Sequence, residues 1–183
     1  MKAGEVKMSL APANYDFGKS SNYSFATTVT CANEMQEKCS LRLRAYAEFN
    51  HEQAIACYMK VAELDPNCAM AYWGIAYCVS SNYNWTPGLG SGYDPIQQAI
   101  SLKAGCSDLE QDLIDALAKR HSKEARDAAD PSVLNMGNTP ELNAAFAAAM
   151  APLYEKYKGN LDVAAIYVEA LMNLKAWQLW DKN

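Results

Sequence analysis

The chain has 183 residues, half of them apolar and a fifth charged, which is the composition of a globular protein. Its 16 basic and 21 acidic residues give a formal net charge of −5, and no cluster of Lys and Arg is present to bind phosphate backbones. These features exclude nucleic acid as an expected partner. Six cysteines without a C-x-x-C pair, no signal peptide and no apolar run of about 18 residues predict a cytoplasmic protein with reduced thiols and no membrane contact.

The first half of the chain predicts an irregular arm followed by closely spaced helices. Residues 1–32 are polar and lack periodicity, so we expect an N-terminal arm before a helical domain over residues 33–183. Apolar residues spaced three and four apart predict a helix over residues 33–49 and another over residues 51–64, with Asn50 and Gln53 as its capping box. Asp65-Pro66 ends the second helix, because the residue before a proline disfavours the α region.

The third helix, residues 69–80, is apolar nearly all round and is therefore predicted to be buried. A loop over residues 80–94 follows, rich in glycine and aromatic residues, and a loop of this length in a compact domain is often functional. Further helices are predicted over residues 94–105, 107–123, 139–159 and 161–174, with Ser107 and Glu110 as a capping box and Asn160 as an N-cap. No segment has the alternation of a strand, so the chain is predicted to be all-α, with about seven helices.

The second and third helices carry the spacing of a tetratricopeptide repeat (TPR) junction, in which small and large residues recur at fixed offsets over ~34 residues. The matching positions are Ala54, Tyr58, Val61 and Pro66, then Tyr72, Ile75 and Ala76. This spacing predicts that Trp73 and Ile75 are buried and that Tyr58 packs against the third helix. We therefore expect an α-α superhelix with one regular TPR-like hairpin and irregular pairs after it.

Several segments resemble a microbial family of large TPR-domain proteins, and they do so over about Tyr15 to Trp180. The resemblance lies in residues 49–54, 65–76 and 82–84, and in residues 167–174 followed by Trp177 and Trp180. The chain departs from the family at Ala47-Glu48 and at Ser80-Ser81. The resemblance implies that this chain corresponds to the N-terminal half of such proteins, which continue into a second half with His-containing motifs. It implies no catalytic residue.

The candidate binding residues each have a structural alternative. His51 opens the second helix, where it is either a ligand or acid–base group or a histidine bonded to a neighbouring segment. Glu169 lies among apolar residues of the last helix and is either functional or hydrogen-bonded to a neighbouring helix. His121, in a charged segment, is expected to be solvated. The two histidines lack the H-x-x-x-H spacing of a recognisable zinc site, and neither metal nor cofactor is predicted.

Aromatic residues supply the remaining candidates. Trp73 is expected in the core but stays a binding candidate, while the loop residues Tyr83, Asn84, Trp85 and Tyr93 are stronger candidates because loops carry function on rigid scaffolds. Trp177 and Trp180 end the chain with an apolar surface that suits a protein partner or self-association. The leading hypothesis is an interaction module that binds through its concave face and the 80–94 loop. The alternative is part of a metal-dependent or other enzyme whose site includes His51 and Glu169 and is completed by a second half.

Overall fold

A computed structural model describes residues 51–84, 91–128, 139–176 and 178–180 of the chain. These residues form seven α-helices and no strand, so the fold class of the described part is all-α, as predicted. The helices are α2 (His51–Leu64), α3 (Ala69–Val79), α4 (Tyr93–Leu102), α5 (Asp108–Ala118), α6 (Lys123–Asp127), α7 (Pro140–Lys156) and α8 (Leu161–Met172). Short 3₁₀ turns follow α4 and α8, at Lys103–Gly105 and Asn173–Lys175. The helix predicted over residues 33–49 and the Asn50–Gln53 capping box lie outside what the structure describes.

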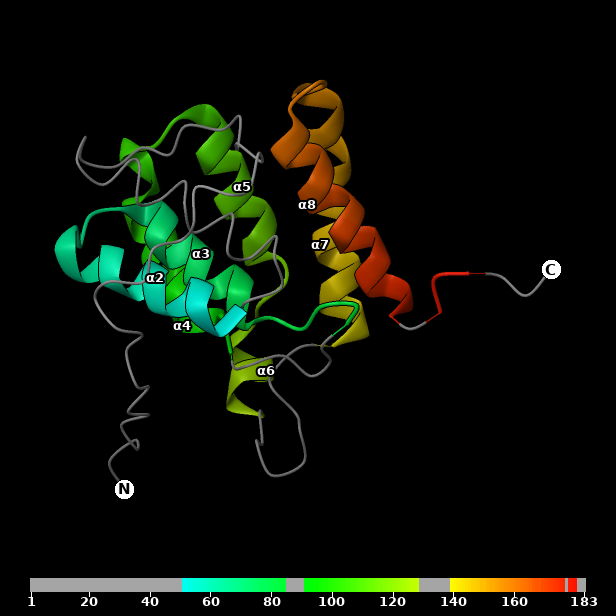
Figure 1. Cartoon of the computed structure of the whole chain (residues 1–183), viewed down its shortest axis with the longest axis horizontal. Helices are drawn as coiled ribbons and strands as arrows, with labels where there is room; N and C mark the ends of the chain where they lie inside the picture. The colour runs from blue at the N-terminus through cyan, green and yellow to red at the C-terminus, as the bar shows by residue number, and fades with distance from the viewer. Residues whose placement is uncertain (1–50, 85–90, 129–138, 177, 181–183) are drawn as a thin grey trace.

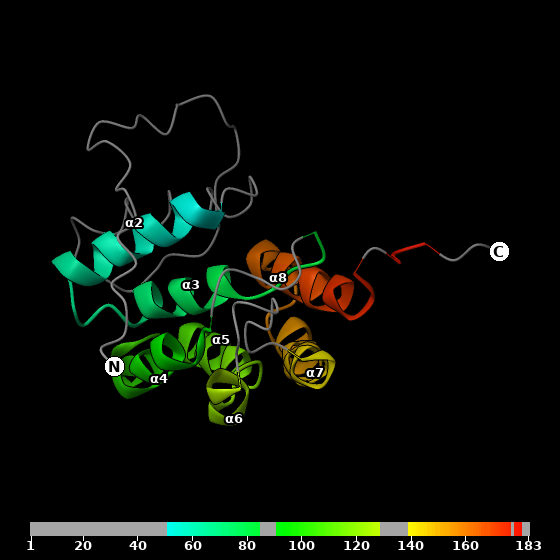
Figure 2. The same cartoon turned by 90° about the horizontal axis from the view of Figure 1, so that it is seen from below.

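The helices pack in chain order, each mainly against its sequence neighbours. Helix α3 lies between α2 and α4, α7 packs against α8, and α5 contacts both α4 and α7. Figure 2 shows α2, α3 and α4 following one another in layers, with α7 and α8 side by side toward the C-terminus. Within the described residues, no helix combines the length and the apolar character needed to cross a membrane.

The local signals at helix ends act as predicted. The Ser107 hydroxyl accepts a hydrogen bond from the Glu110 backbone N–H, and the Glu110 carboxylate accepts from the Ser107 backbone N–H at 2.9 Å. The Asn160 side chain accepts from the backbone N–H groups of Asp162 and Val163, at 3.0 and 3.1 Å. Both arrangements satisfy backbone donors that have no partner inside a helix. They place the first turns of α5 and α8.

Helix α3 forms the centre of the core, as its apolar sequence predicts. Trp73 is 2% exposed, and its indole Nε1 donates to the Leu113 carbonyl on α5 at 3.1 Å. Tyr58 is buried against α3, where its ring covers Gly74. The burial predicted for Trp73 and Tyr58 is confirmed. The prediction for Ile75 is wrong: it is half-buried, because it packs against a smaller cluster between α2 and α3 and keeps one side open to solvent.

Helix α5 ends five residues earlier than predicted, and this changes the environment of two polar side chains. It stops at Ala118, and Ser122 then caps the separate short helix α6 by accepting from the Ala125 backbone N–H at 3.0 Å. The turn between the two helices directs Arg120 and His121 inward. The expectation that His121 is solvated is therefore wrong, because this residue is buried.

The C-terminal helix leaves large apolar side chains exposed. Leu161, Val168, Leu171 and Leu174 are exposed along α8 and the turn that follows it, and Trp180 is 89% exposed. Trp177 is outside the described residues. Figure 1 shows that the chain runs away from the helices after α8, toward the C-terminus.

Candidate functional site

One end of the α2–α3 pair brings together the two residues of the most distinctive sequence motifs. His51 is the first residue of α2, and Asn82 lies three residues after α3 ends. The Asn82 amide Nδ2 lies 3.1 Å from the His51 imidazole Nε2. An amide nitrogen can only donate, so His51 Nε2 accepts, and a neutral ring then carries its proton on Nδ1. The structural alternative considered for His51, a bond to a neighbouring segment, is therefore observed.

Asn82 is held in place by its own backbone as well as by His51. It is 3% exposed, and its side-chain oxygen accepts from the Asn84 backbone N–H at 2.8 Å. This is the local turn that asparagine favours where a helix gives way to a loop. The turn leaves Tyr83 half-buried and Asn84 exposed, so the two candidate residues lie where a ligand could reach them.

Glu169 enters the same region from α8. Its carboxylate Oε2 accepts a hydrogen bond from the Tyr77 hydroxyl at 2.7 Å, joining α8 to α3 across 92 residues of sequence. The Tyr77 ring is buried and stacks on Trp73, with a centroid separation of 5.0 Å and an interplanar angle of 13°. Glu169 itself is half-buried. The carboxylate is therefore positioned by a phenol that the core holds rigidly.

The negative charge of Glu169 influences residues from three segments. Burial lowers the pKa of His51, and the charge of Glu169 opposes this effect by stabilising the protonated ring. Burial raises the pKa of Tyr83, and Glu169 adds to that increase. Cys78, fully buried, has its pKa raised by burial first and by Glu169 second. We call His51, Tyr77, Asn82, Tyr83 and Glu169 the His51–Glu169 cluster.

The other candidates fall into different environments. Trp73 lies in the core, where its indole donates to the Leu113 carbonyl. Tyr93 begins α4 and is half-buried, with the Arg126 guanidinium carbon 4.9 Å from its ring centroid. Trp85 and Trp177 lie outside the described residues. The cluster therefore gathers His51, Tyr83 and Glu169, but neither Trp73 nor Tyr93.

The sequence reasoning missed Arg120 and wrongly expected His121 to be solvated. Arg120 donates from Nη2 to the Ser81 carbonyl, immediately before Asn82 in the chain. His121 is buried, and burial together with the charge of the neighbouring Arg120 lowers its pKa to about 3. A signal for the inward turn is present in the sequence, since Ser122 is a good N-cap residue and starts a new helix.

The described residues offer no complete metal site. Nowhere in the described ranges do three His, Cys, Asp or Glu side chains lie together in a way that could hold a metal ion. Four cysteines, Cys57, Cys68, Cys78 and Cys106, are free thiols.

Comparisons with known proteins leave the family resemblance as an expectation. No protein-family model matches the chain, and searches of curated proteins and of solved structures also give no match. The functional argument therefore depends on the geometry of the cluster and the loop.

Proposed function

We propose that this chain is a helical interaction module that binds a protein segment or small ligand through the His51–Glu169 cluster and the 80–94 loop. A concave superhelical face, predicted from the repeat pattern, belongs to the same proposal. The observation that carries the proposal is the half-buried Glu169 carboxylate of α8, which accepts from Tyr77 on α3 and whose charge acts on His51, itself bonded to Asn82 after α3. A small number of precisely placed polar groups fixes the orientation of a ligand and gives a binding site its specificity.

The chemistry of the cluster favours a ligand that carries a basic nitrogen. Glu169 provides a half-buried carboxylate acceptor, and its charge acts on Tyr83, a half-buried aromatic residue. Carboxylates bind ammonium and guanidinium groups through charge-assisted hydrogen bonds, and aromatic faces attract the same cations. His51, with its lowered pKa, is neutral at pH 7 and adds no positive charge to repel such a ligand. We therefore propose a lysine-like or arginine-like group as the feature recognised, on a peptide or a small amine.

Nuclear magnetic resonance (NMR) tests this directly, with butylammonium chloride as the probe and 1-butanol as its neutral counterpart. We expect butylammonium to shift the His51 imidazole signals in a saturable way, and 1-butanol to leave them unchanged. Glu169→Gln should abolish the shift. The matched control is Glu155→Gln, which removes an exposed carboxylate on α7 and should retain it. Equal responses to the two probes, or saturation unaffected by Glu169→Gln, would count against the proposal.

The alternative, an enzyme or metal-binding fragment, has a separate test. His51 and Glu169 supply two ligand types, and a catalytic zinc site usually needs three protein ligands. Isothermal titration with zinc chloride should give no binding that depends on His51. Tight binding that is lost in His51→Ala would favour the metal-dependent alternative over an interaction module.

A further inference from the structure

The junction between α5 and α6, residues 119–122, contains two buried polar side chains that need an explanation. Arg120 is 0% exposed and His121 is 7% exposed, although both belong to residue types that are mostly found at the surface or only partly buried. Burying a guanidinium is costly unless its donors find partners. The partners of Arg120 and His121 therefore indicate what the junction does.

Arg120 connects the start of the 80–94 loop to α7. Its Nη2 donates to the Ser81 carbonyl, and its Nε donates to the Asn143 side-chain oxygen on α7 at 2.8 Å. The guanidinium also lies 5.4 Å from the centroid of the Phe146 ring. No carboxylate among the described residues forms an ion pair with it. Nε and Nη2 thus bind neutral oxygens of two separate segments and connect them, while the buried Nη1 has no hydrogen-bond partner among the described residues.

His121 fills the space between the two ends of the same loop. Its Nε2 lies 3.3 Å from the Ser80 hydroxyl, which itself donates to the Ala76 carbonyl at 2.7 Å. Because that bond uses the only hydroxyl proton, His121 Nε2 donates to Ser80. On the other side, a Cβ at Gly92 would lie 2.4 Å from His121 Cε1 and 2.8 Å from the Ala76 oxygen. Only a glycine allows this approach.

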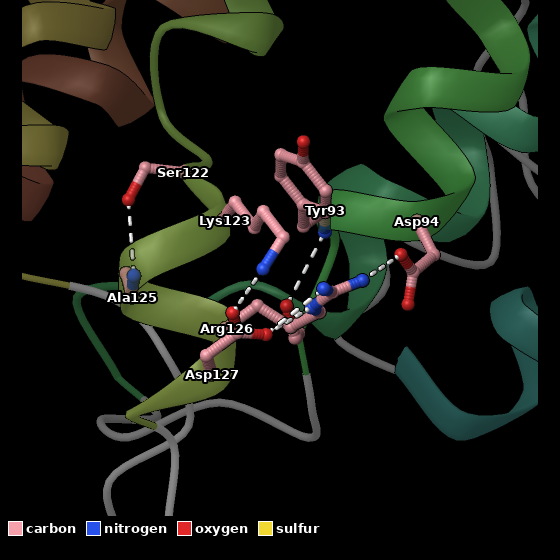
Figure 3. A network of polar contacts seen from close by, with 8 residues as sticks. Tyr93, Asp94, Ser122, Lys123, Ala125, Arg126 and Asp127 are labelled. Carbon is pink, nitrogen blue, oxygen red and sulfur yellow. Dashed lines mark hydrogen bonds and ion pairs between the residues drawn. The ribbon is translucent and has the colours of Figure 1, made fainter.

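Helix α6 adds a second attachment at the end of the loop. Arg126 on α6 pairs with Asp94 and lies over the ring of Tyr93, and Figure 3 shows Tyr93 and Asp94 at the start of α4 facing Arg126. Asp127 pairs with both Arg126 and Lys123 within α6. Residues 120–126 therefore contact the loop at its first residues and at its last.

We infer that Arg120 is a positioning residue of the His51–Glu169 cluster, acting through Ser81 on Asn82. This inference depends on the proposed function only in that the cluster is the binding site. Arg120 fixes the Ser81 carbonyl, and the next residue presents the amide that donates to His51 Nε2. Releasing Ser81 should free Asn82, and His51 should then lose the donor that favours its neutral form. The effect expected is a rise in the pKa of His51, which Glu169 on α8 already favours.

The chain has only two histidines, which makes the measurement simple. His121 has a pKa of about 3, so the imidazole that titrates at higher pH in NMR spectra of the folded protein is assigned to His51. Asn82→Ala removes the donor directly and should raise the pKa of His51 by roughly half to one unit, the size expected for one neutral hydrogen bond. Arg120→Gln should produce a shift of similar size.

A double variant, one control and one conservative variant make the inference falsifiable. Adding Arg120→Gln to Asn82→Ala should give no further shift, because both changes act through the same bond. Lys119→Gln, at an exposed neighbour in the junction, should leave the His51 pKa unchanged. If Arg120→Gln does not fold, Arg120→Lys keeps the charge, cannot reach both acceptors, and should give a partial shift.

A purely structural role for Arg120 would have a different signature. It would lower the melting temperature in the Arg120 variants while the His51 pKa stays at its wild-type value, and that result would overturn the inference. The measurement needs no ligand, so its failure is distinct from a failure of the butylammonium experiment.

Discussion

The contact between Gly74 and Tyr58 allows a quantitative test of the α2–α3 packing. A Cβ at position 74 would lie 2.3 Å from two atoms of the Tyr58 ring, far inside van der Waals contact. Alanine is favoured over glycine inside a helix by up to about 1 kcal/mol. Displacing a well-packed ring typically costs about 1–3 kcal/mol, and Tyr58 is 3% exposed with little room to move. We therefore expect Gly74→Ala to lower the free energy of unfolding by about 1–2 kcal/mol.

Urea unfolding followed by circular dichroism measures this loss, which corresponds to a melting temperature lower by roughly 2–8 °C in a chain of this size. Gly105→Ala is the matched control, because nothing lies within 4 Å of a Cβ at that position. It should be neutral or stabilising by up to about 1 kcal/mol. In a Tyr58→Leu background, Gly74→Ala should cost less than in the wild type. Equal stabilities for Gly74→Ala and Gly105→Ala would refute the packing described for α2 and α3.

Three further predictions concern thiols, pH and association. Burial raises the pKa of Cys78, and it raises that of Cys106 to about 11, so both thiols should react slowly with a thiol reagent in the native protein. All six cysteines should react after denaturation, and fewer than six reactive thiols would indicate a disulfide. The pKa of His121 is about 3 in the folded chain against about 6.5 in the unfolded chain, so the unfolded chain alone binds this proton between these two values. The free energy of unfolding should therefore be highest above about pH 6.5 and fall as the pH is lowered toward 3, and this dependence on pH should be weaker in His121→Gln. Trp180, which is 89% exposed, and the exposed apolar residues of α8 should promote self-association in sedimentation experiments, with Trp180→Ser weakening it. A wild-type monomer at high concentration would contradict this.

Helix positions were predicted well where a local signal marks the end of a helix. The Asp65-Pro66 pair, the Ser107–Glu110 capping box and the Asn160 cap each act over a few residues, and the structure uses all three. The end of α5 was misplaced because the charged residues after Ala118 are compatible with a continuing helix. Only the cap at Ser122 argues for a break, and such a cap weighs little beside an uninterrupted helical pattern.

The members of the candidate site were identified separately, but their assembly was not. His51 and Glu169 were selected because each is an ionisable residue in a distinctive motif. Each has a partner from α3 or the segment after it, Asn82 for His51 and Tyr77 for Glu169, and the second contact depends on how α8 returns to α3, because Tyr77 and Glu169 are 92 residues apart. Periodicity shows which residues share a helix face, and it contains no information about which face of a distant helix they meet.

The glycines of the 80–94 loop illustrate a second limit of the sequence. A loop rich in glycine suggests conformational freedom, which would make it a flexible binding segment. Gly92 has a φ of −86°, which any residue can adopt, so its backbone does not require glycine. It is buried, and the space that a Cβ would need is taken by the His121 ring and the Ala76 carbonyl. At this end of the loop, glycine serves close packing, and the residue that requires it is a histidine whose burial only the tertiary structure reveals.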